Sequence, residues 1–419
     1  MDKEIVLHSA WSEDEEIGTL YINREAGKEN FSFSYSEKWL ERHSSLFLDS
    51  EIQSFPGRQY SEKSLFGFLT DMQPDRWGRQ LIIHRELNLA LQEKRPVRPL
   101  MESDFLLDVS DFSRQGGIRL AFDGEFISRS ESEAPPMTRL KALQEASRSF
   151  QSKDGKTDWM KELVPAGSSL GGARPKANVT DENGRLWIAK FSSLHDVFRA
   201  ENWEALTCEL AALCNLTVPE IKTEKIKDNL IFLTKRFDRE KENRKHFISA
   251  MTALGKADGD SASFLEIADW IRRHQKDPAK DLQELWRRIA FSVLVSNTDC
   301  HLRNHGFLLE KDQWHLSPMY DVNPNPLGTY MALAIDDKNT IKDIHTVLQT
   351  ASFYEISDAK AEVEKMKATM HDHFQRLVDK YSIPRQEALA MQLAFSVFQE
   401  KNKSFAVSKP KGKGFMHGR

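Results

Sequence analysis

Apolar and polar residues alternate at the start of the chain in the way that half-buried β-strands require. Residues 31–35, Phe-Ser-Phe-Ser-Tyr, place every aromatic ring on one face of such a strand. The apolar spacing then lengthens toward that of a helix, with an interruption near Pro74. We predict strands at 5–7, 17–22, 31–35 and 116–122, and helices that begin near residue 36 and cover most of 61–94. Residues 1–125 are therefore expected to form one strand-rich region.

A change in composition over 126–137 gives the best domain boundary, because serines and the pair Pro135-Pro136 gather there. Apolar residues then recur at helical spacing from Leu140 to Phe150, with Thr138 as the predicted N-cap. The large region that follows is strand-rich at first and helical later, so the predicted fold class is α+β with two lobes. The predicted segments are a strand-rich N-terminal region 1–125, a linker and helix 126–164, a second, larger domain 165–400 and a flexible basic tail 401–419.

Composition excludes several classes of protein. Hydrophobic residues make up 40% and charged residues 29%, which rules out collagen-like, low-complexity and wholly disordered chains. The three cysteines have no spacing typical of a disulfide framework or a zinc ribbon, which suits a reducing cytosol. No stretch approaches the roughly 20 apolar residues of a membrane helix, and the first residues lack a signal-peptide pattern. We therefore expect a cytoplasmic protein that does not enter a membrane.

The net charge of −4 is unevenly distributed along the chain. The last 19 residues contain six Lys or Arg and no acid, so the rest of the chain is acidic. A basic tail on an acidic body is typical of a solvated terminus. It does not predict direct nucleic-acid binding by this chain alone.

A glycine-rich segment is the first candidate for ATP chemistry. Glycines let backbone N–H groups approach phosphate oxygens, and serine or lysine side chains add donors. The segment matches neither of the common glycine-rich phosphate-loop motifs, and a plain turn is the alternative. The candidate phosphate-binding residues are Ser168, Ser169, Gly171, Gly172, Ala173, Arg174 and Lys176.

A predicted hairpin follows, because Asn183-Gly184 lies between two alternating runs. Its second strand ends near Lys190, whose ammonium is then placed to bind the α/β-phosphates of ATP, as the strand lysine of kinases does. A strand-end lysine that reaches into water is the alternative. The next helix, 199–213, carries Glu204 beside its apolar stripe, and we expect this carboxylate to reach Lys190 in preference to Glu201 or Glu209.

The sharpest pattern is the pair Asp299 and Asn304, which follows a helix of buried type. Their spacing is that of the kinase catalytic loop, where the Asp receives the proton of the acceptor hydroxyl and the Asn holds magnesium. A polar loop that closes a helix is the alternative. A hairpin over 306–317 should return Tyr320 and Asp321 to Asn304. Asp321 and Asn304 are therefore the predicted magnesium ligands.

His301 lies within this loop and is expected to support it. A transition-metal site is the alternative interpretation of the local His and Asp residues, although no recognised ligand spacing accompanies them. That site would consist of Asp299, His301, His305 and Asp321.

These residues, in this order, resemble the HipA family of serine/threonine kinases. The resemblance is carried by 169–176, 188–191, 201–204, 216–219, 233–239, 297–304 and 320–321, and in the N-terminal region by 17–20, 66–79 and 114–119. It implies autophosphorylation at Ser169, with Ser168 as the second choice. The residues that it adds to the ATP site are Lys235, Arg236, Phe237, His301 and Tyr320. The chain differs from the best-known toxin at Arg174-Pro175 and over 248–255.

The resemblance implies an ATP- and magnesium-dependent serine/threonine protein kinase, like the toxin of a type II toxin–antitoxin system. Toxins of the family phosphorylate a protein of translation, a glutamyl-tRNA synthetase in the best-known case, and a small DNA-binding antitoxin restrains them. Two other functions stay open: a kinase of a small molecule, and a nucleotide-binding regulatory protein without transfer activity. The intact set Lys190, Asp299, Asn304 and Asp321 argues against the last.

Overall fold

The computed structural model describes residues 3–25, 27–127, 134–152, 159–167, 174–240 and 243–398. The N-terminal region is built on a six-stranded sheet of order β4-β3-β2-β1-β5-β6, in which every pairing is antiparallel. Its strands are β1 Lys3–Ser9, β2 Glu15–Glu25, β3 Lys28–Tyr35, β4 Gln59–Tyr60, β5 Ile118–Phe122 and β6 Glu125–Phe126. The alternation over 31–35 puts Phe31, Phe33 and Tyr35 into the core of this region, as predicted.

The helices of the N-terminal region are shorter than the sequence pattern predicts. They are α1 Glu37–His43, α2 Gly67–Thr70, α3 Arg76–Gln92 and α4 Glu102–Asp108. Residues 61–66 are not helical, and the helical conformation is interrupted a second time between α2 and α3. The second break falls at Pro74, which disfavours helical geometry in the residue before it.

Three helical pieces join the N-terminal region to the larger domain: η1 Met137–Arg139, α5 Leu140–Ser152 and α6 Trp159–Gly167. The prediction of Thr138 as N-cap is wrong, because the capping position is Pro136 and Thr138 lies inside the first turn. A backbone hydrogen bond from Thr180 N to Pro135 O (2.9 Å) and a bridge between Pro136 and Thr180 keep the chain extended up to Pro136. Helical geometry therefore begins directly after it.

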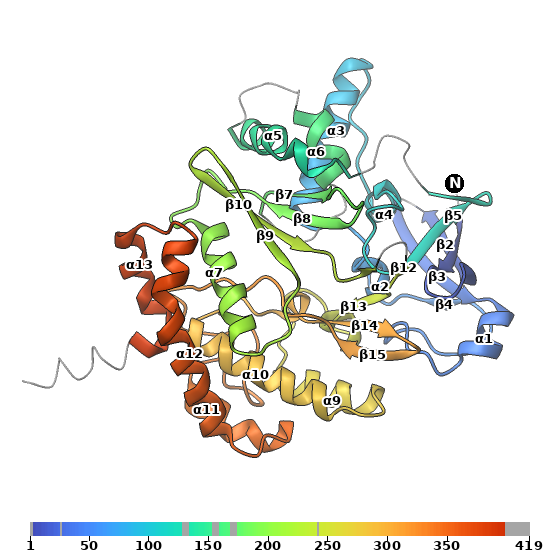
Figure 1. The fold of residues 1–419 in the computed structure, drawn as a ribbon. Coiled ribbons are helices and arrows are strands. Elements are labelled where there is room, and N and C mark those ends of the chain that lie inside the picture. Colours follow the sequence, from blue (N-terminus) through green and yellow to red (C-terminus); the bar gives the residue numbers. More distant parts are fainter. Residues whose placement is uncertain are drawn as a thin grey trace, which may run out of the picture.

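The larger domain begins with a four-stranded antiparallel sheet of order β7-β8-β10-β9. Its strands are β7 Lys176–Thr180, β8 Leu186–Lys190, β9 Ile221–Ile226 and β10 Asn229–Lys235, and α7 Ala200–Leu213 packs against β10. Helices α3, α5 and α6 share an apolar cluster with β7, β8 and β10 and lie above this sheet in Figure 1. The predicted hairpin over 176–190 is therefore present.

The rest of the domain is mainly helical and lies below this sheet in Figure 1. Its largest core cluster extends from Trp203 in α7 to Phe395. Its helices are α8 Ala250–Ala253, α9 Phe264–His274, α10 Ala279–Val295, α11 Ile344–Thr350, α12 Ala359–Lys380 and α13 Arg385–Met391, with short turns η2 Leu302–Asn304, η3 Ala351–Tyr354 and η4 Gln392–Ala394. The remaining strands are β11 Arg239–Glu240, β12 Asn243–Arg244, β13 Phe247–Ser249, β14 Gly306–Glu310 and β15 Gln313–Leu316.

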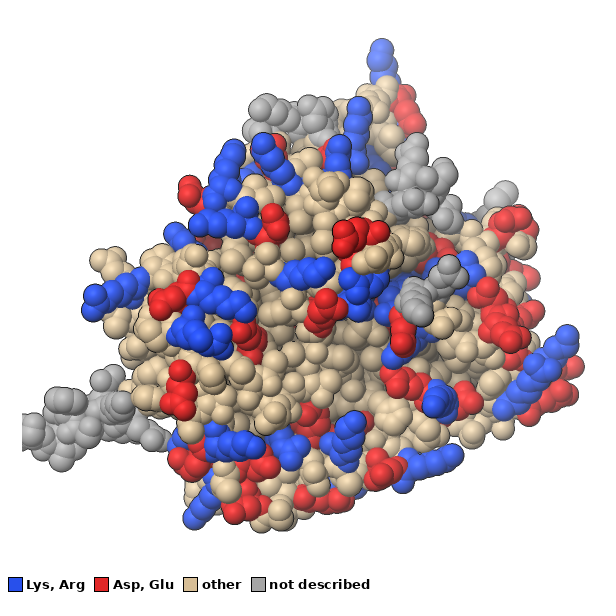
Figure 2. All heavy atoms as spheres, in the orientation of Figure 1, with Lys and Arg blue, Asp and Glu red and all other residues tan. Residues whose placement is uncertain are grey.

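The fold is α+β with a strand-rich upper lobe and a helical lower lobe, as the sequence predicts. Figure 2 shows that basic and acidic side chains are interspersed over one face of the molecule. Within the described ranges, no helix is both long enough and apolar enough to cross a lipid bilayer.

Candidate active site

Three charged side chains meet where the upper and lower lobes adjoin. Lys190 ends β8, and its Nζ lies 2.5 Å from Oε1 of Glu204 on α7 and 2.8 Å from Oδ1 of Asp321. Lys190 and Glu204 are buried, with 7% and 5% exposure, whereas about a third of the Asp321 side chain (32%) reaches the surface. The structure thus brings together the lysine, the glutamate and the aspartate that the sequence predicts to share a site.

The charges of this cluster stabilise one another. Burial alone would lower the pKa of Lys190, but the carboxylates of Asp321 and Glu204 outweigh it and raise that pKa. Burial also favours the protonated form of Asp321, yet the ammonium groups of Lys190 and Lys176 hold its pKa well below the ordinary range. Lys190 and Asp321 are therefore charged at neutral pH and suited to bind phosphate and a cation, respectively.

Lys176 adds a second buried cation to the cluster. It pairs directly with Lys190 across the β7–β8 ladder, so both side chains lie on the same face of the sheet. Burial and the neighbouring Lys190 charge lower the pKa of Lys176 to about 8. By contrast, Arg174 turns away to Asp196 (2.6 Å) and Glu201 (3.1 Å). The other predicted residues of the glycine-rich segment, 168–173, lie outside the described residues.

The catalytic-loop candidates follow the end of α10. Ser296 closes that helix in a left-handed conformation (φ 54°) and turns the chain toward the site. The Asn304 Nδ2 donates to the backbone oxygen of Asp299 at 2.7 Å, which ties the two ends of the loop together. This bond uses the amide nitrogen of Asn304, so its Oδ1 is the atom suited to a metal. The Asp299 side chain is 81% exposed, with His301 Nε2 at 3.9 Å.

Asp321 reaches this loop by the route that the predicted hairpin gives. Strands β14 and β15 return the chain, and the Tyr320 hydroxyl donates to the Arg303 oxygen at 2.7 Å. Asp321 itself has a left-handed backbone (φ 57°), which is uncommon for a residue other than glycine. The Asn323 Nδ2 donates to Asp321 Oδ1 (3.2 Å), and the Asn323 backbone N–H donates to Asn297 Oδ1 (3.2 Å), which connects Asp321 to the start of the catalytic loop.

Residues 235–237, which the resemblance adds to the ATP site, place only part of their side chains near the Lys190 cluster. The Phe237 ring lies 5.5 Å from that of Tyr320, which gives an aromatic surface beside Asp321. Lys235 is half-exposed and pairs with Glu220. The Arg236 guanidinium uses all five N–H groups on other partners and has no donor left for a nucleotide. If Arg236 contacts ATP as predicted, the contact must therefore come from its backbone atoms.

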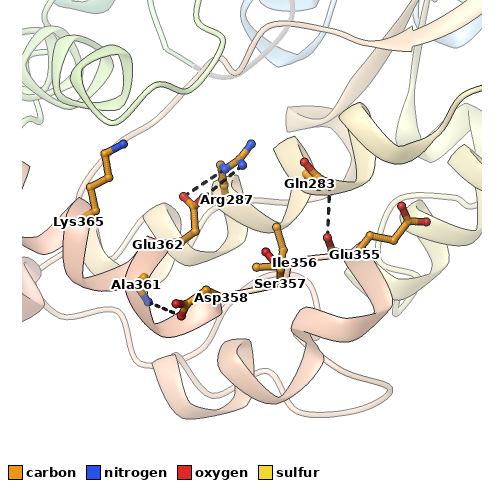
Figure 3. Close-up of a pocket in the computed structure, with 9 residues that line it drawn as sticks. All are labelled: Gln283, Arg287, Glu355, Ile356, Ser357, Asp358, Ala361, Glu362 and Lys365. Carbon is orange, nitrogen blue, oxygen red and sulfur yellow. Dashed lines mark hydrogen bonds and ion pairs between the residues drawn. The ribbon is translucent and has the colours of Figure 1, made fainter.

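The structure favours neither a transition-metal site nor Glu209 as the partner of Lys190. The described part of the chain contains no group of three or more His, Cys, Asp or Glu arranged to hold a metal ion, so the transition-metal interpretation gains no support. Glu209, the competitor of Glu204, pairs instead with Lys380 at 2.5 Å. A separate polar cavity of about 190 Å³ lies between α10 and the start of α12 and contains none of the predicted site residues (Figure 3).

Sequence reasoning missed the roles of two residues that contact the site. Asp75 forms an ion pair with Arg303 inside the catalytic loop, and the Trp77 Nε1 donates to the Lys176 backbone oxygen at 2.9 Å. Asp75 and Trp77 belong to 66–79, a segment that the resemblance identifies but to which it gives no role. The available signal was the density of Asp, Arg and Trp in this short stretch.

The fold and the Lys190–Glu204–Asp321 cluster place this chain in the class of kinase-like proteins. Family comparison agrees with this class: the HipA-like C-terminal domain matches residues 168–394, and the HipA N-terminal domain matches residues 8–101. The first match alone covers more than half of the sequence. The chain belongs to the HipA family.

A similar solved structure comes from the complex of Shewanella oneidensis MR-1 HipA, HipB and operator DNA. A chain of that complex aligns with a TM-score of 0.65 and 17% identity over 96% of this chain and 97% of its own length, which shows a shared fold. A Haemophilus influenzae protein named "Putative kinase" is 29% identical over 187 residues, which cover 38% of this chain. "Putative kinase Y4mE" of Sinorhizobium fredii is 24% identical over 156 residues, or 34% of this chain. The matches span 54% and 37% of these two relatives.

Proposed function

We propose that this chain is an ATP- and magnesium-dependent serine/threonine protein kinase that acts as the toxin of a toxin–antitoxin pair. The observation that carries the proposal is the position of Lys190, buried between Glu204 and Asp321 at the junction of the lobes. A lysine held by a helix glutamate is the arrangement that kinases use to bind ATP phosphates. Family membership and the kinase names of two relatives support the same activity.

The residues present fit ATP and magnesium. Lys190 and Lys176 offer two ammonium groups on one face of the sheet, and the Phe237–Tyr320 pair offers an aromatic surface for a base. Asp321 and the Oδ1 of Asn304 supply two oxygen ligands, which leaves the remaining positions of a magnesium ion to phosphate oxygens and water. Bound magnesium neutralises the charge that develops on the phosphates.

Asp299 is the general base of the proposed reaction. In the proposed reaction its carboxylate accepts the proton of the acceptor hydroxyl as the oxygen–phosphorus bond forms and the bond from the γ-phosphorus to the β,γ-bridging oxygen breaks. The products are a phosphorylated acceptor and ADP. Because Asp299 is 81% exposed, it faces an open surface, which suits a protein acceptor better than an enclosed small molecule.

Three finer features belong to this proposal. Autophosphorylation at Ser169, or at Ser168, would add a charge of roughly −1.5 to −2 close to the phosphate-binding residues and lower activity. The acceptor would be a protein of the translation machinery. A small DNA-binding antitoxin would restrain the kinase, as the complex of the Shewanella relative with HipB and operator DNA suggests.

Radiolabelled ATP tests the proposal directly. The purified chain is incubated with ATP, magnesium and a cell extract, and label is followed on proteins, on small molecules and on the chain itself. Label on protein supports the proposal, and chelation of magnesium is expected to abolish it. Label on a metabolite alone would favour a small-molecule kinase, whereas no label on any acceptor would favour a regulatory nucleotide-binding protein.

The Asp299→Asn variant is the matched control. We expect transfer to fall by at least about 10²-fold, because general-base catalysis and positioning of the hydroxyl are both lost. ATP binding, measured by calorimetry, should stay within about twofold, since Asp299 is not among the phosphate-binding residues. Wild-type turnover by this variant would overturn the assignment of Asp299.

A further inference from the structure

One segment of the N-terminal region contacts both sides of the candidate active site. We call residues 71–79 the linking segment. Asp75 sits at the N-cap position of α3 and forms an ion pair with Arg303, the residue directly before Asn304. Arg303 also binds the exposed Asp258 at 2.7 Å and accepts the Tyr320 hydroxyl on its backbone oxygen at 2.7 Å. The catalytic loop is thus attached to the N-terminal region through one guanidinium group.

Two residues further on, the linking segment contacts the opposite side of the site. Trp77 is buried, with 2% exposure, and its Nε1 donates to the backbone oxygen of Lys176 at 2.9 Å. Lys176 is the first residue of β7 and pairs with Lys190 across the ladder. Trp77 therefore fixes the strand from which Lys176 extends, while Asp75 fixes the loop that carries Asp299 and Asn304.

The linking segment is itself held firmly. Within it, the Arg79 Nε donates to the Pro74 oxygen at 3.1 Å, and the Arg79 guanidinium forms a 2.6 Å ion pair with Glu102 on α4. At the start of the segment, Asp71 Oδ2 accepts the backbone N–H of Ser249 at 2.7 Å, just before α8. A rigid element with contacts to both lobes can set the distance between them.

We propose that Asp75 and Trp77 are positioning residues for phosphoryl transfer, so that the N-terminal region forms part of the catalytic unit. The inference rests on the proposed kinase activity. The two residues act through others: Asp75 holds Arg303 and its charge also favours the protonated form of Lys176, whereas Trp77 holds the backbone of Lys176. A displacement of about 1 Å in a catalytic group can reduce a rate by about 10²-fold. Removing either contact is therefore expected to slow transfer far more than it weakens the fold.

The test uses full-length variants that remove one contact at a time. Asp75→Asn keeps the shape of the side chain but loses its charge, whereas Asp75→Glu keeps the charge. Trp77→Phe keeps a buried ring but loses the N–H donor. We expect the kcat of Asp75→Asn and of Trp77→Phe to fall by about 10- to 100-fold, with the affinity for magnesium-free ATP within about twofold for Asp75→Asn. Asp75→Glu should recover part of the rate.

Two control variants break similar contacts between the N-terminal region and the larger domain that lie away from the site. Asp111→Asn weakens the ion pair with Arg244 (2.7 Å), and Trp314→Phe removes the donation to the Phe47 oxygen (3.3 Å). A purely structural role of the interface predicts that these controls lose as much kcat as the linking-segment variants do. Positioning predicts a kcat within about twofold of wild type for both controls.

Hydrogen exchange of the peptide that contains residues 297–305 adds a measurement independent of activity. The inference predicts faster exchange in this peptide for Asp75→Asn and wild-type exchange for Asp111→Asn. Unchanged exchange together with an unchanged kcat for Asp75→Asn would overturn the inference. If wild type itself transfers no phosphate, the proposed function fails, and the exchange experiment alone then decides whether Asp75 orders the loop.

Discussion

At the scale of single residues, the site combines charges that burial would normally suppress. Lys176 and Lys190 are directly paired residues of strands β7 and β8. Among the described contacts, only Lys190 has carboxylates at hydrogen-bond distance. Burial and the Lys190 charge therefore lower the pKa of Lys176 to about 8 but do not neutralise Lys190. A bound polyphosphate would supply the negative charge that Lys176 lacks and raise its pKa.

This difference predicts a pH dependence of ATP binding. Above pH 8, Lys176 loses its proton in the ATP-free protein. ATP binding then includes the free-energy cost of protonating Lys176 again, so ATP affinity falls. If ATP raises the pKa of Lys176 by about one unit, the loss is about sixfold between pH 7.5 and 9.5. Calorimetry over this range measures it. Lys176→Arg, which keeps its charge, should bind with little change over the same range, and an equally steep loss in this variant would exclude Lys176 as the cause.

At the scale of elements, α7 connects two parts of the site. Its Glu204 holds Lys190 on β8, and one turn later the Thr207 hydroxyl donates to the Val322 oxygen at 2.6 Å, directly after Asp321. Thr207 is fully buried. The helix thus sets the position of Asp321 relative to Lys190 through one charged and one neutral hydrogen bond.

Thr207→Val tests this connection. Valine keeps the shape and the β-branch of threonine but leaves the buried Val322 oxygen without this donor, which costs about 1–3 kcal/mol of unfolding free energy. We also expect weaker magnesium-dependent ATP binding, since Asp321 is less well held. Denaturant unfolding and calorimetry give the two quantities. Thr207→Ser keeps the hydroxyl and should lie close to wild type, and a Val variant as stable as wild type would show that the bond contributes nothing.

Sequence patterns predicted the parts of the fold and site that depend on local spacing. The alternation over 31–35 gave a strand, and the hairpin after Asn304 gave the return of Asp321 toward the catalytic loop. Strand β9 was not predicted, because its residues are half-exposed or exposed throughout and lack alternation. The Trp77 contact could not be predicted, since it joins a side chain to a backbone oxygen 99 positions away, and backbone atoms leave no mark in a sequence.

At the scale of the whole molecule, a buried charge network joins the N-terminal region to the larger domain. The Arg236 guanidinium donates to the Ser113 oxygen (2.6 Å) and the Arg114 oxygen (3.2 Å) and binds Asp238 at 2.5 Å. Asp238 in turn accepts the backbone N–H of Gly116 at 2.8 Å. Because burial disfavours isolated charges, these groups stabilise the molecule only while both regions are folded and in contact.

We therefore expect Arg236→Met to destabilise the molecule by about 3 kcal/mol or more, since it removes the donor to the Ser113 oxygen and leaves Asp238 with fewer partners. Urea unfolding monitored by tryptophan fluorescence measures the loss. A single cooperative transition at lower urea is the expected result. Two separate transitions, with only one of them shifted, would show that the two regions unfold independently.

The unequal exposure of the two halves of the site has a consequence for how such a protein can diversify. The nucleotide half, around Lys190 and Glu204, lies in the core, where most substitutions would also disturb packing. The acceptor half, around Asp299, lies on the surface, where a changed neighbour costs little stability. In the proposed kinase, new protein targets would therefore be acquired by altering surface residues alone, while the residues proposed for phosphoryl transfer stay unchanged.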